Sequence, residues 1–209
     1  MEKVLKFAEK NLSKEITGKG IDKAMRIRSM ALRLWEDEGG NKKIIETVAL
    51  TSDICNSKIF SNLEGQRKKI REFLDKQDYT DYEKGQIMDL IEMLGSTTDY
   101  MSSPMTIEGK ILQDAKRLDE IGAMGIVRTF ASGGARAQEV YKEGQEALDE
   151  VAFTTYSKDG NSCINEFYDR LLKLKDLMNT ETGAKLAEKR HNYMMNFLVE
   201  FYQEWKGLK

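Results

Sequence analysis

The stretch that decides the fold is residues 108–134, with the sequence EGKILQDAKRLDEIGAMGIVRTFASGG. Small or apolar residues recur in it at the spacing of one helix face: Ile111, Ala115, Leu118 and Gly122. Charged residues occupy the other sides: Asp114, Lys116, Arg117 and Asp119. This pattern predicts one amphipathic helix with a buried face. A helix that is apolar on one side and densely charged on the other is typical of the wall of a site, whose role depends on whether its charges hold a metal.

Helical spacing continues on both sides of this stretch. The predicted helices cover residues 1–12, 21–38, 42–55, 66–75, 80–94, 136–150, 164–174 and 187–205. Gly39 and Gly40 end the second of them, and Thr80 with Glu83 fits a capping box at the start of a later one. No segment shows the alternating pattern of a half-buried strand. The sequence therefore predicts an all-α fold, and we expect residues 1–209 to form a single domain.

The composition narrows the class of protein. Charged residues make up 33% of the chain, hydrophobic residues 40%, and there is one proline, which favours a soluble helical protein. The net charge of −2 creates no strong field, so we expect neither nucleic acid nor a membrane as a partner. The N-terminal residues lack the apolar core of a signal peptide. Cys55 and Cys163 are too few for a disulfide scaffold, so we expect reduced thiols and a cytoplasmic location.

The residues alone contain no strong catalytic motif. The only histidine, His191, falls on the apolar side of the last predicted helix, where we expect it to pack and bond to a backbone group or carboxylate. The two cysteines have no C-x-x-C spacing, and neither a phosphate-binding P-loop nor a serine nucleophile elbow is present. The catalytic residues are therefore unknown at this point.

Four blocks of the chain resemble the HD-domain phosphohydrolases, in the subgroup of small, single-domain bacterial members. Two long blocks carry most of the similarity, residues 108–134 and residues 164–205. Residues 20–40 (GIDKAMRIRSMALRLWEDEGG) and 49–60 (ALTSDICNSKIF) resemble the two early helices of the family. The resemblance implies an HD-like helical bundle. It also implies hydrolysis of phosphate esters or nucleotides with one or two divalent metal ions.

The resemblance also implies metal-ligand positions, and this chain departs from most of them. The first histidine ligand corresponds to Lys23, and a further common histidine corresponds to Lys19. The His-Asp pair corresponds to Ser52 and Asp53, and the distant aspartate corresponds to Lys116. Because an ammonium group cannot coordinate a metal, we expect no bound metal, with Asp53 as a weak candidate ligand. We expect Lys23 and Lys116 to pair with Asp53 and to replace the metal centre.

Two functions remain open. In the first, the protein is catalytically silent and binds a phosphate-bearing small molecule or a protein partner, as a homo- or hetero-oligomer. Its candidate anion-binding residues are Lys19, Lys23, Lys58, Lys116, Arg117 and Arg128. In the second, it is an active phosphohydrolase that holds Mg²⁺ or Mn²⁺ weakly, with help from the nearby carboxylates Asp114 and Asp119. The simplest alternative to both is that these lysines are ordinary surface residues with solvated ammonium groups.

Overall fold

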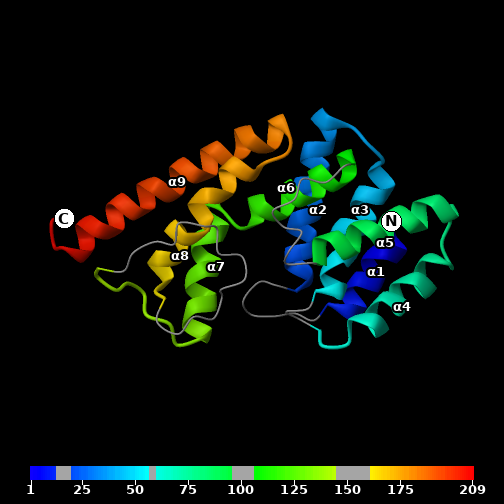
Figure 1. The fold of residues 1–209 in the computed structure, drawn as a ribbon, viewed down its shortest axis with the longest axis horizontal. Helices are drawn as coiled ribbons and strands as arrows, with labels where there is room; N and C mark the ends of the chain where they lie inside the picture. Colours follow the sequence, from blue (N-terminus) through cyan, green and yellow to red (C-terminus); the bar gives the residue numbers. More distant parts are fainter. Residues whose placement is uncertain (13–19, 57–59, 96–105, 145–160) are drawn as a thin grey trace. The chain divides into compact units, whose positions relative to one another are not determined.

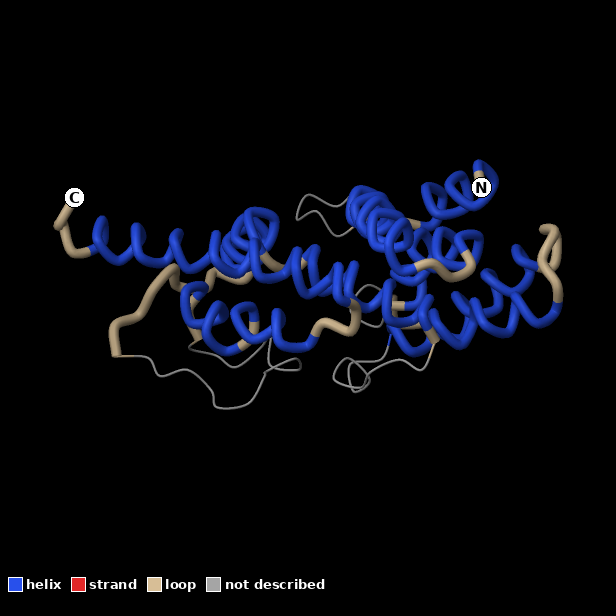
Figure 2. The backbone as a smooth tube through the Cα atoms, turned by 90° about the horizontal axis from the view of Figure 1, so that it is seen from above, coloured by secondary structure: helices blue, strands red, loops and turns tan. Residues whose placement is uncertain are grey.

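The computed structural model describes residues 1–12, 20–56, 60–95, 106–144 and 161–209. Within these ranges the chain forms helices joined by loops and contains no strand, so the prediction of an all-α fold is confirmed (Figures 1 and 2). The chain divides into two compact units, residues 1–116 and 117–209. Each is described by itself below, and the expectation that they form a single domain stays a prediction.

The first unit is built around a short helix that is buried on all sides. Its helices are α1 (Glu2–Asn11), α2 (Ile21–Glu38), α3 (Lys42–Thr51), α4 (Leu63–Leu74), α5 (Asp81–Gly95) and most of α6 (Ile107–Asp119). Every residue of α3 from Ile44 to Thr51 is buried, and α3 packs against α1, α2 and α5. A helix that is surrounded in this way must satisfy its polar side chains internally. Thr47 and Thr51 do so by donating to the carbonyls one turn earlier, at 2.7 Å in each case.

Two helix boundaries of this unit position the polar residues discussed below. Helix α2 has the predicted bounds and ends at Gly39, whose φ of 77° favours glycine. Helix α3 does not run to residue 55 as an α-helix, because its last turn tightens into the 3₁₀-helix η1 (Ser52–Cys55). All four residues of η1 are buried, so the polar pair Ser52 and Asp53 lies inside the unit.

The predicted capping box is also confirmed. The hydroxyl of Thr80 accepts a hydrogen bond from the backbone of Glu83, and the Glu83 carboxylate accepts one from the backbone of Thr80. These reciprocal bonds begin α5, whose inward side chains include Ile87, Leu90 and Ile91.

The single helix predicted for residues 108–134 is wrong, because the stretch forms two helices. Helix α6 ends at Asp119, and α7 (Gly122–Ala135) begins three residues later. Gly122 has a φ of 76°, which a residue with a side chain adopts only with strain. A Cβ on Gly125 would lie 2.3 Å from the carbonyl oxygen of Glu120. The two glycines therefore serve the break between the helices.

The second unit contains α7, α8 (Cys163–Asp169), the 3₁₀-helix η2 (Leu171–Leu177) and α9 (Glu181–Trp205). The helix predicted from residue 136 is wrong over residues 136–144, which form turns and extended chain, and residues 145–150 lie outside the described ranges. The helix predicted for 164–174 is interrupted at Arg170, where φ is −139°. Helices α7, α8 and α9 share a core of phenylalanine rings, Phe130, Phe167 and Phe197. None of the described helices combines the length and apolarity that a bilayer crossing requires.

Candidate functional site

Three charged side chains from three elements meet inside the first unit. Lys23 lies in the first turn of α2, Asp53 in η1 and Lys116 near the end of α6. The ammonium nitrogen of Lys23 is 2.8 Å from Oδ2 of Asp53, and that of Lys116 is 3.5 Å from Oδ1. Their side chains are 9%, 1% and 8% exposed, respectively. We call these three residues the ion-pair cluster.

Attraction to the two lysines keeps Asp53 ionised. Burial alone would raise the pKa of this carboxyl, because it disfavours the charged form. The positive charges of Lys23 and Lys116, together with polar contacts from the side chains of Lys23 and Asn56, outweigh burial. The pKa of Asp53 is therefore held well below its ordinary value of 3.8.

The backbone surroundings of the two lysines differ in their electrostatic effect. Lys116 also donates to the carbonyl oxygen of Leu94 at 3.1 Å, in the last turn of α5, where the negative end of the helix dipole favours a cation. Lys23 lies at the opposite kind of position, in the first turn of α2, where the dipole disfavours a cation. Its contact with Asp53 is therefore the main favourable interaction that we can identify for its charge.

The cluster is balanced by charge more than by directed hydrogen bonds. Although Lys23 lies close to Asp53, neither carboxylate oxygen has a well-aligned hydrogen bond from a described residue. The buried hydroxyl of Ser52 also has no hydrogen-bond partner there. An unpaired buried hydroxyl costs about 1–3 kcal/mol, so the arrangement is not optimised for hydrogen bonding.

The side chains of this cluster do not fit a divalent metal ion. Such an ion needs several carboxylate, imidazole or thiolate ligands converging on one point, and the cluster supplies one carboxylate between two ammonium groups. Among the described residues, no group of three or more histidine, cysteine, aspartate or glutamate side chains is arranged to hold a metal. His191, the only histidine in the sequence, lies on α9 in the other unit.

The other predicted site residues are distributed over both units. Lys19 and Lys58 lie outside the described residues. Asp114 is fully buried in the part of α6 that belongs to the first unit. Arg117, Asp119 and Arg128 belong to the second unit. Of the four predicted anion-binding residues that the structure describes, Lys23 and Lys116 therefore meet around Asp53 in the first unit, and Arg117 and Arg128 lie in the second.

Two of these second-unit residues form a partly buried ion pair beside the break after α6. Arg128 donates to the carboxylate of Asp119 at 2.7 Å and to its backbone carbonyl at 3.1 Å. Arg117, which is 1% exposed, donates to the carbonyl of Leu177. These bonds occupy the guanidinium groups with contacts inside the protein, and their evident role is to hold the chain where α6 ends.

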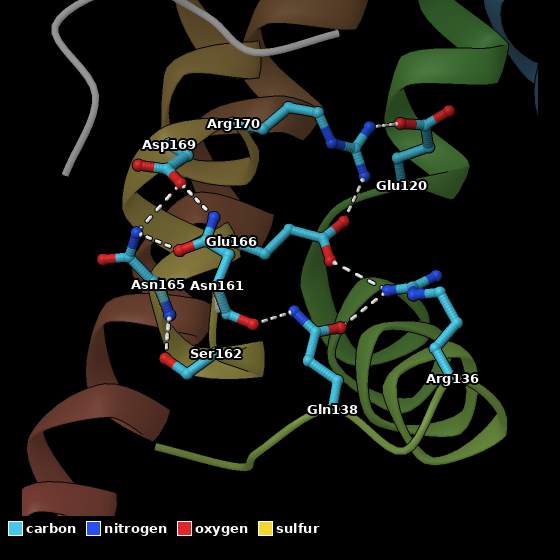
Figure 3. Close-up of polar contacts among 9 residues, drawn as sticks. All are labelled: Glu120, Arg136, Gln138, Asn161, Ser162, Asn165, Glu166, Asp169 and Arg170. Carbon is cyan, nitrogen blue, oxygen red and sulfur yellow. Dashed lines mark hydrogen bonds and ion pairs between the residues drawn. The ribbon is translucent and has the colours of Figure 1, made fainter. Parts of the chain in front are cut away.

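Sequence reasoning missed a larger polar network in the second unit (Figure 3). Asp169 accepts hydrogen bonds from the amide groups of Asn161, at 2.6 Å, and Asn165, at 2.9 Å. Arg170 pairs with both Glu120 and Glu166. Asn165 and Asp169 are four residues apart on α8 and share one face of it, which is a signal the sequence contains, whereas Asn161 lies just before the helix. We call the nine residues drawn in Figure 3 the α8 network.

The α8 network fixes the start of α8 against the chain that follows α7. Ser162 caps α8 by accepting from the backbone of Asn165, and Gln138 donates to the carbonyl of Asn161. Arg136 bonds to Gln138 at 2.8 Å (Figure 3). Its members are occupied with one another, and we assign it a structural role.

Comparison with known proteins finds relatives that match over nearly the full length. No protein-family profile matches the chain. A crystal structure of an HD-superfamily hydrolase from Bacillus thuringiensis is 36% identical, covers 98% of this chain and 96% of its own, and has a TM-score of 0.79. A crystal structure of a protein from Lactobacillus plantarum is 28% identical, with coverage of 99% and 96% and a TM-score of 0.82.

The third relative has been solved with a ligand. YpgQ, an uncharacterized protein of Bacillus subtilis (strain 168), is 29% identical over an alignment of 212 positions, which covers 99% of this chain and 94% of YpgQ. Its crystal structure in complex with ADP has a TM-score of 0.77 and covers 100% of this chain and 99% of YpgQ at 26% identity.

Proposed function

This chain belongs to the HD superfamily, and on that premise we propose that it is a catalytically silent member, whose ion-pair cluster stands at the positions that the resemblance to the HD-domain phosphohydrolases assigns to metal ligands. The observation that supports this proposal is the distance of 2.8 Å between Lys23 and the buried Asp53. The ammonium groups of Lys23 and Lys116 lie against the two oxygens through which this carboxylate would bind a metal ion. Family membership alone would suggest a hydrolase, but fold does not determine activity.

Electrostatic repulsion makes a metal ion costly at this position. A divalent ion 4 Å from one ammonium group is repelled by about 8 kcal/mol at an effective dielectric constant of 20. Lys23 and Lys116 are both in contact with Asp53, so an ion bound to this carboxylate meets both. One carboxylate cannot compensate for that repulsion, so metal binding would require the lysines to move or lose their protons.

An activity assay tests the proposal directly. We expect the full chain to hydrolyse none of a panel of nucleotides and phosphate monoesters in Mg²⁺, Mn²⁺ or Co²⁺. The contradicting result is turnover that disappears in Asp53→Asn. That result would establish the alternative function, an active phosphohydrolase with weakly bound Mg²⁺ or Mn²⁺.

A second assay reports on the metal without relying on activity. The double variant Lys23→His/Lys116→Asp exchanges both ammonium groups for metal-ligand types on either side of Asp53. We expect Mn²⁺ to raise the melting temperature of this variant and to leave that of the wild type unchanged, because an ion that binds only the folded state stabilises it. A manganese-dependent rise in the wild type that Asp53→Asn removes would overturn the proposal.

The ADP complex of YpgQ favours a phosphate-bearing small molecule as the ligand of this protein. Lysine and arginine bind phosphate groups without a metal. We expect ADP to bind the wild type in the presence of EDTA and less tightly as salt increases. Lys19→Gln and Lys58→Gln test the predicted anion site and leave the three residues of the ion-pair cluster unchanged, and we expect each to weaken ADP binding roughly fivefold or more. Absence of ADP binding in EDTA contradicts this part of the proposal.

A further inference from the structure

One side of α9 carries exposed residues at the spacing of a coiled-coil seam. The residues are Glu188, Asn192, Met195, Val199, Tyr202 and Lys206, with intervals that alternate between four and three. This alternation places the first five along one line of α9, because 3.5 residues approximate one turn, and Lys206 follows directly after the helix as its C-cap. All are exposed except Tyr202, which is half-buried. We call this line the α9 seam; α9 is the orange-to-red helix of Figure 1.

The apolar centre of the seam has no evident role inside the chain. Met195 is 38% exposed and Val199 is 54% exposed, whereas Met194 and Leu198 on the neighbouring side of α9 are buried. Valine is also a weaker helix former than the lysine, glutamate or glutamine that usually occupy exposed helix positions. An exposed valine beside an exposed methionine at seam spacing is therefore a feature that a partner helix would explain.

The order of residues along the seam makes it complementary to itself in the antiparallel direction. A two-fold axis at the level of residue 197 places Glu188 opposite the partner's Lys206 and Met195 opposite the partner's Val199. Asn192 then lies opposite the partner's Tyr202, whose hydroxyl bonds to Tyr168 of its own chain. In a parallel pair, Glu188 would face glutamate and Lys206 would face lysine, and both contacts repel. The charge order therefore selects a second copy, and it selects the antiparallel alignment.

From this complementarity we propose that two copies of the chain associate through the α9 seam as an antiparallel helix pair. The contact is isologous, so each pairing across it occurs twice and closes the assembly at a dimer. It extends over 18 residues of helix, or about 27 Å. The interface is small and mostly polar at its ends, which is typical of a dimer that dissociates on dilution. The inference rests on the second unit alone and is independent of the proposed function.

Sedimentation velocity of the full chain over a range of concentrations tests the dimer. We expect a concentration-dependent dimer in the wild type and a dissociation constant raised at least tenfold in Val199→Glu, because the new carboxylate faces the partner's Met195. Tyr193→Glu is the matched control. Tyr193 is a 56% exposed apolar residue on the same helix but off the seam, so the dissociation constant should stay unchanged. A wild type that stays monomeric at every concentration, or a dimer that tolerates Val199→Glu, overturns the proposal.

A charge exchange tests the alignment. Glu188→Lys and Lys206→Glu should each weaken the dimer, because each places like charges opposite one another. The double variant Glu188→Lys/Lys206→Glu restores opposite charges across the contact and should recover the wild-type dissociation constant. Glu188 also pairs with Lys175 on the surface at 3.1 Å, and loss of that contact is common to Glu188→Lys and the double variant, whereas Lys206→Glu keeps it. Failure of the double variant to recover the dimer would rule out the antiparallel alignment.

Discussion

In residues 1–116 the buried carboxylate of Asp53 lies between two ammonium groups, whereas in residues 117–209 the buried carboxylate of Asp169 accepts hydrogen bonds from two asparagine amides. The first carboxylate is balanced by charge, and its contacts are poorly directed. The second is balanced by neutral donors at 2.6 and 2.9 Å in a well-directed arrangement. Asp53 also has an unbonded hydroxyl beside it in sequence, that of Ser52.

The difference distinguishes a site from a structural element. Where a buried carboxylate serves only to fix a helix in place, well-aligned hydrogen bonds from uncharged groups satisfy it, and no positive charge is needed. Where charge was needed for chemistry, substitution of the ligands leaves a charge that must be balanced in another way. The α8 network has the first character, and the proposed function gives the ion-pair cluster the second.

The largest effect is expected for Asp53→Ala. This change leaves two buried lysines without their shared counter-ion, and loss of one partner of a buried ion pair costs about 3–5 kcal/mol of unfolding free energy. Urea unfolding at neutral pH measures it. The control is Glu36→Ala, which removes an exposed partner of Arg33 and should cost less than about 1 kcal/mol. Equal losses in both variants would mean that the cluster is not held together by charge.

A smaller loss is expected for Asp169→Ala in the α8 network. This change leaves the amides of Asn161 and Asn165 without their acceptor, at a cost of about 2 kcal/mol. Urea unfolding again gives the value, and Asp81→Ala, at a fully exposed position, is the control. If Asp169→Ala costs more than Asp53→Ala, the ranking of the two clusters is reversed.

The pH dependence of stability tests the charge balance of the ion-pair cluster. The pKa of folded Asp53 lies below its ordinary value, so the stability that its ionisation contributes is complete above that value and is lost as the pH falls below about 4. We expect the wild type to lose about 1 kcal/mol more than Asp53→Asn between pH 5 and pH 3. Urea unfolding curves of the wild type and Asp53→Asn at pH 5 and pH 3 measure how far the difference between their unfolding free energies shrinks. If the difference in unfolding free energy between the two proteins is the same at both pH values, Asp53 is not stabilised in its charged form.

The smallest effect is expected when the whole cluster is replaced. In Lys23→Met/Asp53→Leu/Lys116→Met, no charge remains unpaired, and buried ion pairs replaced by apolar residues often leave stability unchanged. We expect an unfolding free energy within about 1 kcal/mol of the wild type, measured in urea. A loss as large as that of Asp53→Ala would indicate that the three side chains do more than balance one another.

Much of the fold was predictable because helical signals are local. The bounds of α2 and the capping box of α5 follow from glycines and from a Thr-x-x-Glu spacing, each readable within a few residues. The break between α6 and α7 was missed because Gly122 and Gly125 are equally compatible with a packed helix face. Only the backbone conformation distinguishes the two uses, and Gly122 adopts a φ of 76°.

The candidate site was predicted only in part. The pairing of Lys23 and Lys116 with Asp53 was expected from the resemblance to the HD-domain family, and both ion pairs are present. The correspondence of these positions to metal ligands stays a prediction. Arg117 and Arg128 were grouped with the lysines because all carry the same charge. Their actual partners, Leu177 and Asp119, depend on chain geometry that charge alone does not reveal.

By itself, the sequence determined that this protein is helical and that it has one histidine, too few for the histidine ligands of the family it resembles. These are properties of residue type and local spacing. The tertiary structure decided that Asp53 is buried between two ammonium groups and that Asp169 is bonded to two amides. The partner of a buried charge comes from an element that is distant in the sequence and packs beside it. Helical periodicity is a local pattern and does not predict which element that is.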